Sequence, residues 1–295
     1  MTYPYEVSLR LSEEEIDSFL KLHNLGNLRQ IKRIAQGIES STFSLITERN
    51  SFVLTLFNEQ KNLPLIQEAT SFFTTQGFPF AKILSIGEIN KKPATISLHL
   101  KGKGKNEWSL KEYETIGFVL GNLHKCAENF TKPIKTHPFI WQLSQNFYEI
   151  QHQIPKEFLV LEQEIFFLEE HYPSHLPKGL IHGDLWHTNI LFSNDSVSGI
   201  LDFNPSYEPF ILDLSNLIKG IFDEECKDTL LSAYELTRPL SSEEHAYLPL
   251  FTYAKIVATI IYLLKKSLHY PDRKDRFQTH AFMNLLKLQD LCLSL

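Results

Sequence analysis

The sequence predicts an α+β protein in which a small, strand-rich lobe precedes a larger helical lobe. Runs of β-branched and aromatic residues, which favour strands, fill much of residues 40–57 and 82–100. From Leu110 onward the apolar residues recur at intervals of three and four, which is the spacing of one helix face. These two observations assign the strands to the first third of the chain and the helices to most of the remainder.

The best candidate boundary between the lobes is the segment Lys101-Gly-Lys-Gly-Lys-Asn106. It combines glycines and lysines and offers no apolar side chain to bury. We therefore expect an N-terminal lobe over residues 1–100, a hinge over 101–108 and a C-terminal lobe over 109–295.

Within the first lobe, the segment Ser12–Leu22 opens with a Ser-x-x-Glu capping box, which predicts a short helix. Two strands are expected over Ser40–Thr47 and Ser51–Phe57, where β-branched and aromatic residues are frequent. The polar break Glu48–Asn50 between them is typical of a hairpin turn.

A second helix is expected over Leu65–Gln76, because its apolar residues have helical spacing and Gly77 is a suitable residue to end it. Two further strands are expected over Lys82–Gly87 and Pro93–Leu100, joined by a polar turn.

In the second lobe another Ser-x-x-Glu capping box begins a helix at Ser109. Two more helices are expected over Phe139–Ile150 and Lys156–His171. A short β element follows over Gly179–Leu201, and helices run from about Asp213 to the end of the chain.

Composition excludes several classes of protein. The 295 residues include 43% hydrophobic and 22% charged residues, which is ordinary for a soluble globular protein and argues against disorder, collagen and coiled coil. The 29 Lys and Arg residues against 35 Asp and Glu residues give a net charge of −6, which argues against a nucleic-acid partner. The sequence does not indicate the oligomeric state.

The cysteines predict neither a disulfide framework nor a zinc site. Cys126, Cys226 and Cys292 are odd in number and far apart, with no Cys-x-x-Cys motif. Because the N-terminus also lacks the pattern of a secretory signal, we expect a reduced, cytoplasmic protein.

One apolar segment, Tyr247–Leu264, has nearly the length of a membrane span. It contains Pro249 and Lys255 together with several hydroxyl-bearing residues. These features favour a buried core helix, so no membrane partner is expected.

The most informative stretch is Leu180–Phe192, which contains the sequence His-Gly-Asp-x₄-Asn. It presents Asp184 after a tight turn at a strand end and Asn189 where the chain re-enters a strand, while Asp202 stands at the tip of the next strand. Phosphoryl transfer to a hydroxyl needs a carboxylate that orients the hydroxyl and oxygen ligands for Mg²⁺, and these residues supply both. The alternative is an ordinary turn, but a chance match to this motif has odds of only roughly one in a thousand.

This stretch resembles the catalytic loop of the aminoglycoside phosphotransferase and choline kinase superfamily, whose members have a protein-kinase-like two-lobe fold. Four N-terminal segments are similar to the type II homoserine kinases of bacteria within that superfamily: Gln36–Phe43, Phe52–Phe57, Gln76–Pro79 and Lys92–Ala94. The resemblance covers roughly residues 30–220.

The resemblance implies a role for each residue of the loop. Asp184 would be the catalytic base, Asn189 and Asp202 would bind Mg²⁺, and His182 and Asp213 would support the site structurally. The resemblance also makes the first lobe the nucleotide-binding lobe and the second the catalytic and acceptor-binding lobe.

The resemblance further implies that seven residues of the first lobe bind ATP: Gly37, Ser40, Ser41, Thr42, Thr55, Leu98 and Leu100. The loop that begins at Gly37 would cover the triphosphate, and the strand that contains Leu98 would present backbone groups to the adenine. Thr55 stands where many related kinases have a lysine, and the homoserine kinases also have threonine there.

Several functions stay open at this point. Homoserine is the best single guess for the acceptor, and an aminoglycoside or another amino alcohol is the alternative. The resemblance implies that the segments Asn204–Phe210 and Lys219–Phe222 help to form the acceptor side, and both differ from those of the homoserine kinases. A catalytically silent pseudokinase would explain the missing lysine, but it has no chemical need for the complete set of Asp184, Asn189 and Asp202.

Overall fold

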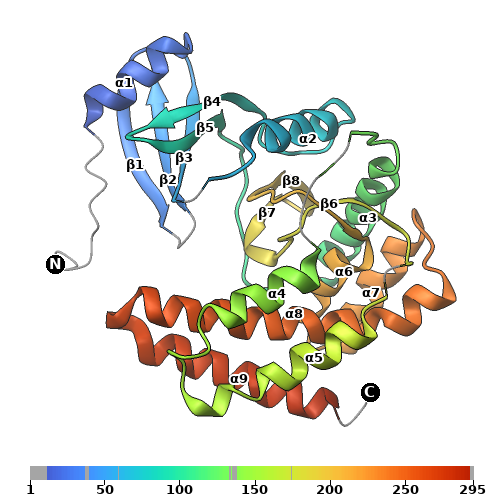
Figure 1. Ribbon diagram of the computed structural model, residues 1–295. Coiled ribbons are helices and arrows are strands. Elements are labelled where there is room, and N and C mark those ends of the chain that lie inside the picture. Colours follow the sequence, from blue (N-terminus) through green and yellow to red (C-terminus); the bar gives the residue numbers. More distant parts are fainter. Residues whose placement is uncertain are drawn as a thin grey trace. The chain divides into compact units, whose positions relative to one another are not determined.

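The computed structural model describes residues 12–36, 40–58, 60–132, 134, 138–173 and 175–292. The chain divides into two compact units (Figure 1). The first unit comprises the residues up to Gly102 together with Ser198–Leu201, and the second comprises Lys103–Val197 and the residues from Asp202 onward.

The first unit is an antiparallel five-stranded sheet with the strand order β1-β2-β3-β5-β4, accompanied by two helices. Its elements are α1 (Glu13–Leu22), β1 (Leu28–Gln36), β2 (Ser40–Thr47), β3 (Ser51–Phe57), α2 (Leu63–Thr75), β4 (Ile83–Ile89) and β5 (Lys92–Leu98). Alternate residues of β3, namely Phe52, Leu54 and Leu56, are buried with Phe19 and Leu20 of α1. Burial of one sheet face under a helix therefore stabilises this unit.

The predicted elements of the first unit are confirmed. The Ser12 hydroxyl accepts a hydrogen bond from the Glu15 amide and the Glu15 side chain accepts one from the Ser12 amide, so the capping box begins α1. The bounds of β2 and β3 agree with the sequence, and α2 begins two residues earlier than expected because Asn62 caps it. The turn between β4 and β5 passes through Asn90 and Lys91, which both have positive φ.

One strand of this sheet, β1, was not predicted. It lies at the edge of the sheet, where it pairs with β2. Its apolar residues fall at every third position, and Ile34 is 52% exposed. Because an edge strand with little buried surface needs no strict alternation, the sequence carries no clear strand pattern there.

The second unit holds most of the helices. The elements of the rest of the chain are α3 (Leu110–Ala127), α4 (Phe139–Tyr148), η1 (Lys156–Phe158), α5 (Leu161–His171), β6 (Lys178–Ile181), η2 (His187–Asn189), β7 (Ile190–Ser193), β8 (Ser196–Ile200), β9 (Ser206–Pro209), α6 (Ile211–Ile218), α7 (Glu224–Glu235), α8 (Ser242–His269), η3 (Pro271–Arg273) and α9 (Lys274–Cys292). The predicted capping box at Ser109 is confirmed. The helix expected over Lys156–His171 is divided into the short turn η1 and the helix α5.

The segment expected to be a hinge makes specific contacts at residues 103 and 105. Lys103 and Phe192 exchange two backbone hydrogen bonds of 2.9 and 3.0 Å. The Lys105 ammonium forms an ion pair with Glu112, which is 2% exposed. These contacts attach residues 103–105 to the second unit.

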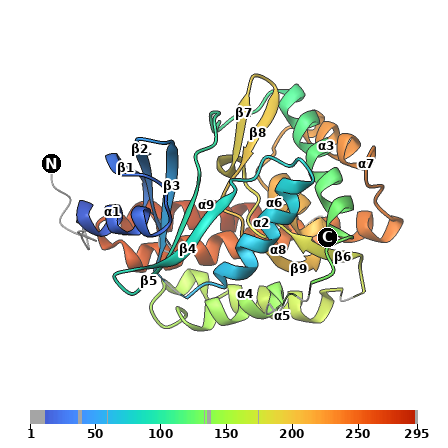
Figure 2. The same cartoon turned by 90° about the horizontal axis from the view of Figure 1, so that it is seen from above.

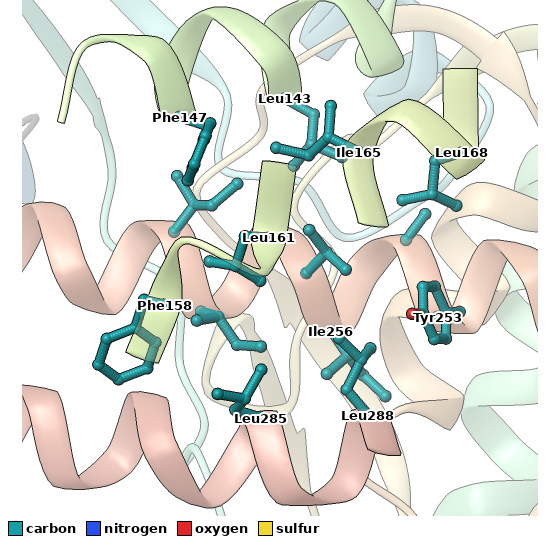
Figure 3. Close-up of a cluster of buried hydrophobic side chains, with 14 of the residues drawn as sticks. Leu143, Phe147, Phe158, Leu161, Ile165, Leu168, Tyr253, Ile256, Leu285 and Leu288 are labelled. Carbon is teal, nitrogen blue, oxygen red and sulfur yellow. The ribbon is translucent and has the colours of Figure 1, made fainter. Parts of the chain in front are cut away.

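A hydrophobic core forms where α4, α5, α8 and α9 pack together (Figure 3). Leu161 and Ile165 of α5 lie in it with Tyr253 of α8 and Leu285 of α9. The helix α8 is long and apolar enough to cross a membrane by length and composition, yet 61% of its most apolar stretch is buried inside the protein. It is therefore a core helix, as the sequence favours.

Candidate active site

The paired strands β6 and β9 bring the two parts of the predicted catalytic motif together (Figure 2). The strands are antiparallel and Ile181, the last residue of β6, lies opposite Ser206, the first residue of β9. The chain therefore leaves β6 and enters β9 at the same end of the pair. The loop that begins at His182 and the segment that begins at Asp202 lie at this end.

The carboxylate of Asp213, near the start of α6, holds the backbone of the loop. This carboxylate is fully buried and accepts hydrogen bonds from the amide of His182 at 2.6 Å and from the amide of Gly183 at 2.9 Å. On the other side, the His182 carbonyl accepts a hydrogen bond from the Asn204 amide at 3.1 Å. The turn is thus fixed between α6 and the segment that precedes β9.

Glycine is required at position 183 for two reasons. Its φ of +82° is one that other residues rarely adopt, and a Cβ atom there would lie 2.2 Å from the Asn204 carbonyl oxygen. The motif's glycine therefore permits both the turn and the close approach of the two segments.

A buried polar network lies behind Asp213. His124 Nε2 is 3.4 Å from the Asp213 carboxylate, and His124 Nδ1 is 2.8 Å from the Tyr234 hydroxyl. The Tyr234 hydroxyl also accepts from Arg238, which forms a buried 2.8 Å ion pair with Glu244. Burial by itself would raise the pKa of Asp213, but the hydrogen bond with His124 and the nearby positive charges lower it below its ordinary value. Asp213 is therefore a carboxylate, the form that accepts hydrogen bonds from amides.

The loop presents Asp184 and Asn189 close together. Asp184 is exposed, and its amide donates to His182 Nδ1 at 3.2 Å. The side-chain amide of Asn189 donates to the Asp184 carbonyl at 2.9 Å, and its distance to Asp184 Oδ2 is 3.5 Å. Asn189 is only 8% exposed, so its position is fixed by the surrounding chain.

Asp202 begins the segment that lies against the turn. Its φ is +53°, a left-handed conformation that aspartate tolerates better than most residues. The ring of the next residue, Phe203, lies 5.5 Å from the fully buried ring of His182. The structure therefore places Asp202 in the same unit as the loop, next to residues that contact it.

Three residues that hold the loop were not singled out in the sequence. The Asn216 side chain donates to the Leu185 carbonyl at 2.6 Å, and the Lys255 ammonium donates to the Gly183 carbonyl at 3.2 Å. The third, His124, contacts Asp213. Asn216 gives a sequence signal because it stands one helical turn after Asp213 in a largely apolar helix, and Lys255 gives one because it is a charged residue within an apolar segment.

Lys219, at the end of α6, faces the same loop. Its ammonium lies 4.8 Å from the ring centroid of Trp186 and donates a 2.8 Å hydrogen bond to the Thr259 hydroxyl. Burial and, to a smaller extent, repulsion from Lys255 lower the pKa of Lys219 to about 7. The negative charge of Asp184 opposes this shift. A second ammonium group therefore lies close enough to influence Asp184.

The first unit presents three of the expected ATP-binding hydroxyls on one face of the sheet. Thr42 and Thr55 lie opposite each other on β2 and β3, and Ser40 is on the same face as Thr42. Ser41 lies on the opposite face and is only 4% exposed, so its hydroxyl points toward the core of this unit.

The other expected ATP-binding residues are distributed as follows. Gly37 lies outside the described residues. Leu98 ends β5, where it pairs with Phe52, and its amide donates to the Lys82 carbonyl at 3.0 Å. Leu100 follows the strand and is half-buried.

The donor chemistry of the loop fits Mg²⁺. Among the described residues, no group of three or more His, Cys, Asp or Glu side chains is placed to hold a metal ion. Mg²⁺ in phosphoryl-transfer sites is bound by one or two protein side chains together with phosphate oxygens and water, so it does not require such a group. The amide of Asn189 and the carboxylate of Asp202 are oxygen donors of the suitable kind.

An antiparallel sheet in one unit, a helical second unit and a His-Gly-Asp-x₄-Asn loop define a kinase-like phosphotransferase. The family model described as "Phosphotransferase enzyme family" matches residues 30–248, and the chain belongs to this family.

Known proteins confirm the predicted resemblance. A homoserine kinase from Sinorhizobium fredii is 28% identical over 271 residues, which cover 81% of this chain and 80% of the relative. The solved structure of an amicoumacin kinase with AMP-PNP and Ca²⁺ has a TM-score of 0.71 at 17% identity and covers 91% of this chain and 94% of that one. The apo structure of a thermostable mutant of the aminoglycoside phosphotransferase APH(4)-Ia has a TM-score of 0.70 at 14% identity and covers 94% of this chain and 99% of that one. The expected protein-kinase-like fold is thereby confirmed.

Proposed function

We propose that this protein transfers the γ-phosphoryl group of Mg-ATP to the hydroxyl of homoserine. The observation that carries the proposal is that Asp184 is exposed on a loop whose backbone is held by hydrogen bonds to the carboxylate of Asp213. The homoserine kinases that match four-fifths of this chain support homoserine as the acceptor.

In this proposal Asp184 acts on the acceptor. Its carboxylate accepts the proton of the acceptor hydroxyl and aligns that oxygen for direct in-line attack on the γ-phosphorus. Asn189 and Asp202 would hold Mg²⁺, and the bound ion would neutralise charge on the phosphate oxygens. His182 and Asp213 keep the loop in this geometry, because their hydrogen bonds fix the backbone on which Asp184 stands.

The first unit binds ATP in this proposal. The hydroxyls of Ser40, Thr42 and Thr55 share one face of the sheet and donate to phosphate oxygens there, and the residues after β5 contact the adenine. Residues 1–100 form the nucleotide-binding lobe, 101–108 the hinge and 109–295 the catalytic and acceptor-binding lobe. The proposed reaction takes place in the cytoplasm.

The test is a coupled assay of ADP release with Mg-ATP and a panel of acceptors: L-homoserine, choline, ethanolamine, hydroxylysine and several aminoglycosides. Wild-type enzyme is expected to turn over homoserine. Asp184→Ala is expected to lower kcat by about 10²- to 10⁴-fold, the usual contribution of general-base catalysis. Asp195→Ala, in the exposed turn between β7 and β8, is the matched control.

The outcomes separate the candidate functions. Turnover of another acceptor but not of homoserine would support the proposed mechanism and identify a different substrate. Nucleotide binding without turnover of any acceptor would instead favour a silent pseudokinase.

A further inference from the structure

Two lysines lie beside the catalytic loop and are attached to the same turn of α8. The Lys219 ammonium donates to the hydroxyl of Thr259, and this hydroxyl in turn donates to the carbonyl of Lys255 at 2.8 Å. The Lys255 ammonium donates to the Gly183 carbonyl. One lysine therefore comes from the end of α6 and the other from α8, and the charge of Asp184 acts on both.

Neither ammonium group has a carboxylate within ion-pair distance among the described residues. Arg238, another buried cation, differs in this respect because it pairs with Glu244 at 2.8 Å. Lys255 is only 6% exposed, and burial lowers its pKa. Lys255 donates one hydrogen bond to the Gly183 carbonyl and lies 4.8 Å from the ring centroid of Phe139. Neither contact supplies the negative charge that offsets the cost of burying a cation, so this arrangement requires an explanation.

Three carboxylates act on Lys255 through their charge, namely Asp213, Asp184 and Glu208. Two of them already have other hydrogen-bond partners. Glu208 accepts hydrogen bonds from the Phe139 amide and the Tyr172 hydroxyl, and Asp213 accepts from the turn. An ammonium group has three donors, but each lysine makes one hydrogen bond to the described chain. The two side chains therefore retain donors for an anion from outside the chain.

The ring of Trp186 packs against one of these two lysines, Lys219. Its indole lies under the Lys219 ammonium, and a Cβ atom on Gly220 would lie 2.4 Å from the ring. Gly220 thus allows the ring to pack closely against the end of α6. Trp186 stands two residues after Asp184, so the ring that contacts Lys219 belongs to the same loop as Asp184.

We propose that Lys219 and Lys255 bind the carboxylate of the acceptor and thereby select a hydroxyl-bearing amino acid. The proposal rests on the proposed function, because it takes Asp184 as the residue that orients the hydroxyl. Two cations at this position also repel acceptors that carry several ammonium groups, so the site disfavours aminoglycosides.

The decisive comparison uses L-homoserine and 3-amino-1-propanol, which lacks only its carboxylate. Lys219→Met is expected to raise the KM for homoserine about 10- to 100-fold, the effect of losing one charge-assisted hydrogen bond. The KM values for 3-amino-1-propanol and for ATP are expected to stay unchanged. Lys219→Arg should restore most of the binding. Lys227→Met, on α7, where the lysine is half-buried and pairs with Glu224, is the matched control.

Other results overturn the proposal. If Lys219→Met raises the KM for ATP, or lowers kcat equally with both acceptors, the lysine serves the phosphoryl group instead. Calorimetric titration with L-2-aminobutyrate and with propylamine tests the site without turnover. If the wild-type protein binds L-2-aminobutyrate no more tightly than propylamine, which lacks the carboxylate, the proposal is contradicted.

Failure of the proposed function has a different signature. Turnover of another hydroxy acid, with a raised KM in Lys219→Met, would remove homoserine as the acceptor and leave the carboxylate site standing. Turnover restricted to alcohols without a carboxylate would overturn both.

Discussion

The carboxylate of Asp213 accepts a hydrogen bond from the amide of Gly183, 30 residues earlier in the chain, at 2.9 Å. A second bond, from the neighbouring amide of His182, makes this carboxylate a clamp on the turn that carries Asp184. The clamp is itself buried and is held from behind by His124. The position of the proposed catalytic carboxylate therefore depends on a residue that is inaccessible to any substrate.

Asp213→Asn is expected to lower both stability and turnover. The amide side chain cannot offer two carboxylate oxygens to two N–H donors, so one buried donor loses its partner at a cost of about 1.5–3 kcal/mol. Displacement of the loop should lower kcat by about 100-fold, because catalytic geometry tolerates errors of less than 1 Å. Urea unfolding and steady-state kinetics measure the two effects. Asp228→Asn, exposed on α7, should leave both unchanged. Wild-type kcat in a folded Asp213→Asn protein would contradict the clamp.

Gly183→Ala is expected to destabilise the protein more than Gly77→Ala does. Both glycines have positive φ, +82° and +87°, so both substitutions introduce backbone strain of about 1 kcal/mol. A Cβ atom on Gly77 has no neighbour within 4 Å, whereas a Cβ atom on Gly183 would lie 2.2 Å from a backbone oxygen. The difference in the free energy of unfolding between the two variants measures the cost of the steric clash at position 183. Equal destabilisation would show that the loop moves away freely.

The KM for homoserine is expected to rise as the pH increases through 7. Burial and the nearby Lys255 lower the pKa of Lys219 to about 7, so its ammonium loses its proton above that pH and its attraction for a carboxylate weakens. The groups that act on it are Lys255 from α8 and Asp184 and His187 from the loop. Kinetics between pH 6 and 8.5 measure the effect.

Lys219→Arg is the control for this pH dependence. A guanidinium stays charged throughout the range, so the profile of this variant should be flat. An identical rise in both proteins would assign the dependence to another group.

The sequence predicted the framework of the fold well, because its signals there are local. The strands over 40–57 alternate regularly around a polar turn, and the capping boxes at Ser12 and Ser109 involve residues only three apart. The strand β9 was missed, because Ser-Tyr-Glu-Pro is short, polar and contains a proline. Its pairing with β6 nevertheless brings the two halves of the motif together.

The motif located the candidate site, but its surroundings could not be predicted. His-Gly-Asp-x₄-Asn is a compact signal, and the structure shows Asn189 bonded to the Asp184 backbone. His124 and Lys255 lie 60 residues before and 71 residues after Asp184, on helices whose packing brings them to the loop. Neither residue lies near the motif in the sequence. The roles assigned to the loop residues stay predictions until the variants are measured.

The helix α8 contributes both to the hydrophobic core and to the surroundings of the loop. Ile256, Val257 and Ile260 belong to the core shared with α4, α5 and α9, while Lys255 and Thr259 on the same turns reach the loop side. A shift of this helix that accommodates a change in the core therefore also moves the groups around Asp184. Substitutions in the core, far from any substrate, can thus alter which acceptor the protein uses. New acceptor preferences can therefore evolve through changes in the core.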